Sequence, residues 1–169
     1  MRVILGLLIL LTACNSGPQK DAVSFKDLES LQGNWSGTQA LLLSDDKTVI
    51  NYPAKLLATL LKDSLELSIT NAFTDGHQET EKGILSINEN SSMLILGGSE
   101  YQIREVIRTN DDLTISAYKE DEDNEQQAKI RLTINIKATE LMILREVKYL
   151  GTVSFLKRID LKLKKDRRI

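Results

Sequence analysis

The side chains that most often carry out chemistry are scarce in this chain of 169 residues, which contains one cysteine, Cys14, and one histidine, His77. One cysteine cannot form an internal disulfide or a thiolate metal cluster. One histidine leaves the usual zinc sites and histidine-based catalytic arrangements without enough partners. The sequence also contains no G-x-S-x-G segment and no P-loop. It therefore predicts a protein that is not an enzyme and that holds no cofactor or metal.

Carboxylates cluster in residues 120–125, which read EDEDNE. Five carboxylates and one amide offer enough oxygen ligands for calcium, but the segment lacks the glycine and the alternation of an EF-hand loop. We interpret it as the solvated tip of a hairpin. Glu79 and Glu81 would lie on one face of a strand, where we interpret them as a surface pair.

Cys14 follows an uncharged apolar run, residues 3–11, that comes directly after Arg2. Nine helical residues rise only about 14 Å, too short to span a bilayer but typical of the hydrophobic region of a secretory signal. The tetrapeptide Leu11–Thr12–Ala13–Cys14 resembles the lipobox of bacterial lipoproteins. The resemblance implies that residues 1–13 are cleaved and that Cys14 is lipidated, and Asn15 after the cysteine implies sorting to the outer membrane. The alternative is an ordinary signal peptide with a cysteine near its cleavage site.

Polar segments flank the region that we expect to fold. Residues 14–30 are interpreted as a flexible tether between lipid and domain, and residues 164–169 as a basic tail. The segment Asp63–Ser64–Leu65 matches a short O-glycosylation pattern of some exported bacterial proteins, which makes Ser64 a candidate glycosylation site.

The body of the chain alternates apolar and polar residues, most clearly in residues 128–138, where every second residue is apolar. This period of two indicates strands with one dry and one wet face. Turn-forming clusters separate the strands and favour hairpins, so the sequence predicts an all-β antiparallel up-and-down meander. Residues 54–62 also have apolar spacing compatible with a helix, although we favour a strand.

The first predicted strand opens with Gly33–Asn34–Trp35, which resembles the G-x-W signature of lipocalins. The resemblance implies a barrel of about eight strands over residues 31–163, with Gly33 and Trp35 at its floor. It also implies a basic residue from the end of the chain stacked on the tryptophan, for which Arg158 (or Lys157) is the candidate. A β-sandwich or a half-open sheet, with Trp35 as a core residue, is the alternative.

The formal net charge of −2 gives no indication of nucleic-acid binding. The leading hypothesis is a monomeric, non-enzymatic outer-membrane lipoprotein whose lipocalin-like domain binds a small apolar or amphipathic ligand. The alternative is a structural or interaction lipoprotein of the cell envelope with a filled barrel and a protein or glycan partner. A cavity inside the barrel would distinguish the first from the second.

Overall fold

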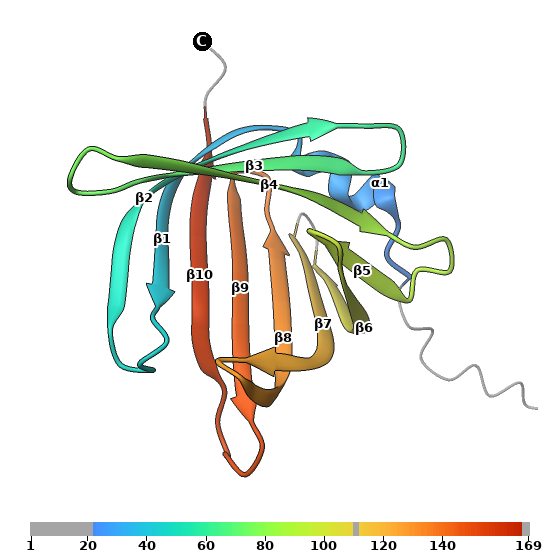
Figure 1. The fold of residues 1–169 in the computed structure, drawn as a ribbon. Coiled ribbons are helices and arrows are strands. Elements are labelled where there is room, and N and C mark those ends of the chain that lie inside the picture. Colours follow the sequence, from blue (N-terminus) through green and yellow to red (C-terminus); the bar gives the residue numbers. More distant parts are fainter. Residues whose placement is uncertain (1–21, 110–111, 167–169) are drawn as a thin grey trace, which may run out of the picture.

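The computed structural model describes residues 22–109 and 112–166, which form a closed antiparallel barrel of ten strands (Figure 1). Each strand pairs with its neighbours in sequence, and β1 also pairs with β10 to close the sheet. The strands are β1 Gly33–Leu42, β2 Val49–Leu60, β3 Leu65–Ala72, β4 Gln78–Ile87, β5 Met93–Leu96, β6 Ser99–Thr109, β7 Asp112–Asp123, β8 Gln126–Ile136, β9 Glu140–Tyr149 and β10 Leu156–Lys165. The predicted all-β meander and barrel are confirmed, with ten strands rather than about eight. Closure of the sheet excludes the sandwich and half-open alternatives.

The up-and-down topology gives the barrel two ends with different connections. A short helix α1, Phe25–Leu28, and a 3₁₀ turn η1, Glu29–Leu31, lie at one end, which we call the helix end. The opposite end, which we call the loop end, carries the β1–β2, β3–β4, β5–β6, β7–β8 and β9–β10 connections.

The alternation read from the sequence sorts side chains between the interior and the outside. On β2, Leu56 and Ala58 are buried, whereas Leu57 between them is 46% exposed. β2 pairs along its length with β1 and β3, which satisfies the backbone hydrogen bonds of both edges. The strand prediction for residues 54–62 is therefore confirmed up to Leu60, and the helical alternative is wrong.

Closure brings β1 and β10 unusually close at Gly37. A Cβ on this residue would lie 2.0 Å from the backbone oxygen of Lys162, which no side chain could tolerate. Glycine is thus required where the two ends of the sheet meet.

The N-terminal segment is part of the folded domain. Val23, Leu28 and Leu31 are fully buried in the core cluster that contains Trp35. Ser24 and Asp27 form a capping box at α1, and Arg108 on β6 pairs with Asp27 at 2.9 Å. The predicted domain boundaries are therefore corrected at both ends: residues 23–30 of the predicted tether 14–30 belong to the folded domain, and the first two residues of the supposed basic tail 164–169 belong to β10.

The buried core and the strand pairings lie within residues 23–165. A chain that begins at Ala22 therefore contains the residues that make the core and the sheet. The lipidation prediction at Cys14 and the signal sequence 1–13 lie outside the described residues. Among the residues that are described, no helix is long and apolar enough to cross a membrane.

Candidate functional site

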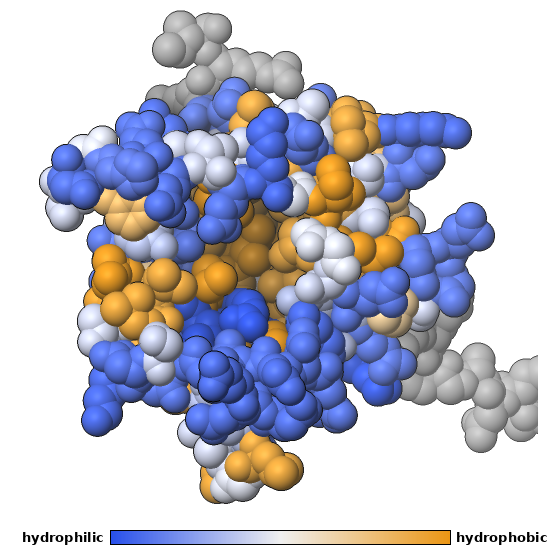
Figure 2. Space-filling view, viewed as in Figure 1, coloured by the Kyte–Doolittle hydropathy of each residue, from blue (hydrophilic) through white to orange (hydrophobic). Residues whose placement is uncertain are grey.

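A cavity of about 220 Å³ lies inside the barrel. Figure 2 shows the molecule hollowed near the centre of one face, with hydrophobic residues within the hollow and hydrophilic residues below it. Strands from all sides of the barrel contribute the wall, because their inward-facing residues alternate with outward-facing ones. Its hydrophobic and aromatic members are Leu67, Ile69, Leu96, Tyr101, Leu132, Ile143, Ile159 and Leu161.

Four polar or charged residues of the wall interrupt this apolar surface: Gln39, Glu81, Lys82 and Arg145. Gln39 is buried and donates to the hydroxyl of Tyr52 at 3.3 Å. Arg145 lies opposite Leu132 in the β8–β9 register, a position that otherwise carries apolar inward-facing residues. Both terminal nitrogens of Arg145 donate to the same Asp123 oxygen, each at 3.2 Å. The cavity thus combines an aliphatic wall with the guanidinium of Arg145, while Glu81 and Lys82 also line it. The Lys82 side chain is 65% exposed and paired with Glu66.

Asn71 is not among the residues that line the cavity, but it carries an unsatisfied acceptor on the inward face of β3, two residues beyond Ile69. The residue is 6% exposed, and its side-chain oxygen has no hydrogen-bond partner among the described residues. A buried amide oxygen without a partner costs free energy, so it favours a donor from a bound molecule or a water.

A cluster of buried charges lies at the loop end, centred on Asp123 and Arg158. Arg158 Nε donates to Asp123 Oδ2 at 2.8 Å, and Arg158 Nη1 donates to the Leu43 carbonyl at 2.8 Å. The hydroxyl of Tyr149 donates to Asp123 at 2.8 Å, and Asp46 also pairs with Arg158. We call Asp46, Asp123, Tyr149 and Arg158 the ionic cluster. It joins the β1–β2, β7–β8 and β9–β10 connections to one another.

Within the ionic cluster, Asp123 and Arg158 are held in their charged forms and Tyr149 in its neutral form. Burial alone would raise the pKa of Asp123, but hydrogen bonds from Tyr149 and Arg158 outweigh burial and hold this pKa below its usual value. Burial and the neighbouring Asp123 raise the pKa of the Tyr149 hydroxyl. Burial would lower the pKa of Arg158, yet its bonds to Asp123 raise it overall. Asp123 therefore remains a carboxylate beside a guanidinium at neutral pH.

The structure places Arg158 at the opposite end of the barrel from Trp35, which corrects the prediction that these residues stack. Trp35 is 1% exposed, and its Nε1 donates to the Leu31 carbonyl at 2.7 Å at the helix end. Trp35 lies opposite Lys165 in the register, and Lys165 Nζ lies 5.0 Å from the centre of the indole ring. Arg158 precedes Lys165 by seven strand residues, or about 24 Å. The cation on the tryptophan is thus Lys165.

Gly33 precedes Trp35 with a φ of +122°, in the region that favours glycine. A Cβ there would lie 3.6 Å from Lys165 Cε, so the residue also leaves room for the lysine stem.

The remaining candidates lie on connections and on β4. Ser64 is half-buried in the β2–β3 turn. His77 and Glu79 are both 59% exposed and lie 3.3 Å apart, and Glu81 follows them along β4. Within residues 22–109 and 112–166, no three His, Cys, Asp or Glu side chains are grouped so that they could hold a metal ion.

The acidic segment 120–125 is not entirely a solvated tip, because the side chain of Asp123 is only 9% exposed. Sequence reasoning also missed Arg145 and Tyr149. A signal for Arg145 was present: it is a charged residue in the inward register of a strand, between Ile143 and Val147. Its partner Asp123 comes from a different hairpin, which periodicity does not reveal.

The comparisons with known proteins identify the fold. No protein-family model and no curated protein sequence matches the chain. The chain is similar to the crystal structure of Rv2717c from M. tuberculosis, with a TM-score of 0.63 and 15% sequence identity. The match covers 85% of this chain and 97% of that one. At this identity the likeness concerns the barrel fold alone.

Proposed function

We propose that this protein is a non-enzymatic lipoprotein of the bacterial outer membrane whose barrel binds a small amphipathic molecule with an acidic group. The observation that carries the proposal is the interior cavity of about 220 Å³, with an aliphatic wall and Arg145. Ligand sites commonly span about 300–1,000 Å³, so a small ligand suits this volume. An entirely filled barrel would instead have favoured a structural role.

The chemistry of the cavity selects a ligand with two parts. Leu132, Ile143 and Leu161 favour a hydrocarbon segment, because burial of apolar surface stabilises the complex by roughly 25 cal/mol per Å². Arg145 favours an anion, since a guanidinium has five N–H donors and a bond to a carboxylate is charge-assisted. Its two hydrogen bonds to Asp123 are long, and three donors have no partner within the described residues. A medium-chain carboxylic acid fits both requirements.

Binding of octanoate and of octanol to the purified barrel, residues 22–169, tests this chemistry by calorimetry. Octanoate should bind more tightly than the alcohol of equal length, and Arg145→Gln should weaken octanoate binding about tenfold or more while leaving octanol binding little changed. Arg131→Gln is the matched control, because Arg131 lies on the outer face, paired with Glu146 at 2.7 Å.

Equal binding of octanoate by wild type and Arg145→Gln would contradict the role of Arg145. If neither compound binds, and mass spectrometry of the native protein finds no co-purifying molecule, the structural or interaction alternative replaces the ligand-binding one.

The lipoprotein part of the proposal is supported by the lipobox resemblance at residues 11–14. We expect Cys14→Ser to accumulate as an uncleaved precursor without lipid, because the modified sulfur is absent. Intact-mass measurement of both proteins, together with fractionation of the membranes, checks this. Normal processing of Cys14→Ser would contradict the lipobox assignment.

A further inference from the structure

The β9–β10 loop, residues 150–153, holds the two most exposed large apolar side chains among the described residues. Leu150 is 91% exposed and Val153 is 93% exposed. Figure 1 shows that this connection projects beyond the strands at the loop end, and Figure 2 shows hydrophobic residues at the same lower tip. Two fully exposed aliphatic residues at a projecting tip favour an apolar partner.

Hydrogen bonds within the β9–β10 loop fix its conformation. The backbone N–H and the hydroxyl of Thr152 both donate to the Tyr149 carbonyl, at 3.1 and 2.9 Å. Gly151 adopts a φ of +84°, which completes the turn. Tyr149 is itself fixed by the ionic cluster. The outward position of Leu150 and Val153 is thus built into the turn.

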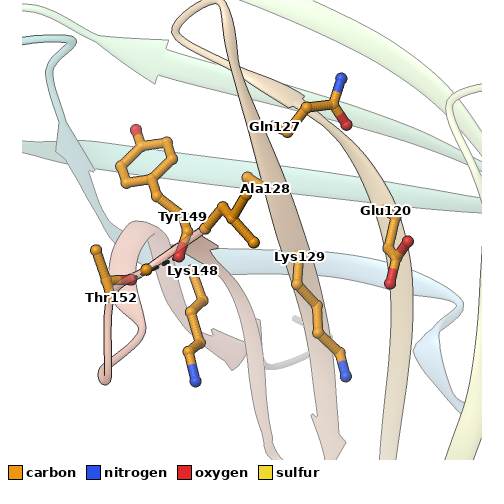
Figure 3. Close-up of a pocket in the computed structure, with 9 residues that line it drawn as sticks. Glu120, Gln127, Ala128, Lys129, Lys148, Tyr149 and Thr152 are labelled. Carbon is orange, nitrogen blue, oxygen red and sulfur yellow. Dashed lines mark hydrogen bonds between the residues drawn. The ribbon is translucent and has the colours of Figure 1, made fainter.

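Two lysines lie beside this loop. Lys129 and Lys148 are directly opposite each other in the β8–β9 register, and both line an open groove that also includes Leu150. Figure 3 shows their ammonium ends turned the same way. Like charges opposite each other on neighbouring strands repel, so a partner with negative charge would relieve the repulsion.

We propose that the β9–β10 loop docks the barrel onto an anionic lipid bilayer. Leu150 and Val153 enter the boundary between head groups and acyl chains, and Lys129 and Lys148 contact the lipid phosphates. Lys148 and Leu150 are two residues apart, or about 7 Å along an extended chain. Interfacial segments bury their apolar side chains about 5–10 Å deep at this boundary. The spacing therefore places the ammonium groups at the level of the phosphates while the apolar tip is inserted.

Carboxylates of the neighbouring β7–β8 hairpin weaken this attraction without cancelling it. Asp121 is paired with Lys119 at 2.5 Å, and Asp123 is paired with Arg145 and Arg158. The field of these two acids is therefore largely neutralised within the protein, which leaves the lysines beside the loop able to attract phosphates. Glu120 lies on the groove wall directly opposite Lys129, and Glu122 and Glu125 are exposed on the same hairpin. We therefore expect the apolar pair to supply most of the binding.

Co-sedimentation of the barrel, residues 22–169, with phosphatidylcholine vesicles that do or do not contain phosphatidylglycerol tests the proposal. Wild type should bind the anionic vesicles, and Leu150→Ser with Val153→Ser should lower the partition coefficient about tenfold or more. Lys129→Gln with Lys148→Gln should lower binding to anionic vesicles and leave binding to neutral ones unchanged. The matched control is Leu60→Ser with Leu61→Ser at the helix end, where these residues are 38% and 43% exposed.

A tryptophan reporter provides a second measurement. The single native tryptophan, Trp35, is buried, so emission from Val153→Trp should shift to shorter wavelength on anionic vesicles and be quenched by brominated acyl chains. The proposal would be overturned if wild type did not bind the anionic vesicles. It would also be overturned if replacing Leu60 and Leu61 reduced vesicle binding as much as replacing Leu150 and Val153, or if the emission of Val153→Trp did not shift. The proposal does not depend on the cavity ligand, so loss of octanoate binding leaves it intact.

Discussion

The two ends of the barrel are closed by different physical means. At the helix end, Trp35, Leu28 and Leu31 form an apolar plug in which the main polar contact is the indole N–H to a carbonyl. At the loop end, Asp123 and Arg158 join three hairpins through a buried ion pair. The apolar plug opens only by exposing hydrocarbon to water. The ionic cluster, in contrast, depends on the charge of a few side chains.

This difference indicates which end is a permanent closure and which end is conditional. Hydrophobic burial is insensitive to pH and adds with area, so the helix end should resist most changes of solution. A buried ion pair balances a desolvation cost against attraction, so removal of one partner leaves the other charge uncompensated. The cavity wall reaches the conditional end, because Arg145 contacts Asp123 of the ionic cluster.

The largest expected effect is at the apolar plug. Trp35→Ala should lower the free energy of unfolding by about 3–5 kcal/mol, because it removes a fully buried ring and leaves a void. Urea denaturation followed by circular dichroism measures the change. Leu57→Ala, on the outer face of β2, is the control and should cost well under about 1 kcal/mol. A loss of less than about 1 kcal/mol in Trp35→Ala would show that the indole does not close this end.

The ionic cluster should give the next largest effect. Asp123→Asn should lower the free energy of unfolding at pH 7 by about 2–3 kcal/mol, because Arg158 loses its charged acceptor in a buried position. The same urea titration measures it. Asp121→Asn is the matched control at the same end: Asp121 is half exposed and paired with Lys119, so its loss should destabilise the fold clearly less than Asp123→Asn. Equal effects of the two substitutions would contradict a special role for the ionic cluster.

Lowering the pH should reduce the difference between wild type and Asp123→Asn. The pKa of Asp123 is depressed in the folded protein, so the unfolded chain takes up this proton first as the pH falls. The stability contributed by Asp123 is therefore complete above about pH 4, near the unfolded pKa, and is lost as the pH falls through the lower folded value. Urea titrations at pH 7, 5, 4 and 3 should show the two curves converging only at the acidic end. Convergence near neutrality would mean that Asp123 is not the group responsible.

The smallest expected effect tests the cation at the helix end. Lys165→Met should lower the free energy of unfolding by about 0.5–1 kcal/mol, because it removes the cation above the Trp35 ring and the bond to the Ser30 carbonyl. Trp35 fluorescence during urea denaturation reports both the stability and the surroundings of the ring. Lys164→Met, on the outward face of the same strand, is the control. An unchanged emission and stability in Lys165→Met would indicate that the apolar plug needs no cation.

The sequence by itself determined the strands and their faces. A period of two in residues 128–138 is a local property, because successive side chains of an extended chain point to opposite sides. The turn clusters determined that neighbouring strands are antiparallel, since short connections permit nothing else. Gly33 and Trp35 marked the start of the first strand through the resemblance to the lipocalin G-x-W signature, not through the period of two.

Only the tertiary structure decided which distant residues meet. Whether Arg158 or Lys165 lies on Trp35 depends on the register between β1 and β10 and on the irregularity of β10 between Lys157 and Ile159. The alternating pattern of a single strand reveals neither. Burial of Asp123 depends on Arg145 and Arg158, which come from two other strands. The same holds for the cavity: its wall is the sum of inward side chains around a closed sheet, and that sum exists only once ten strands have closed.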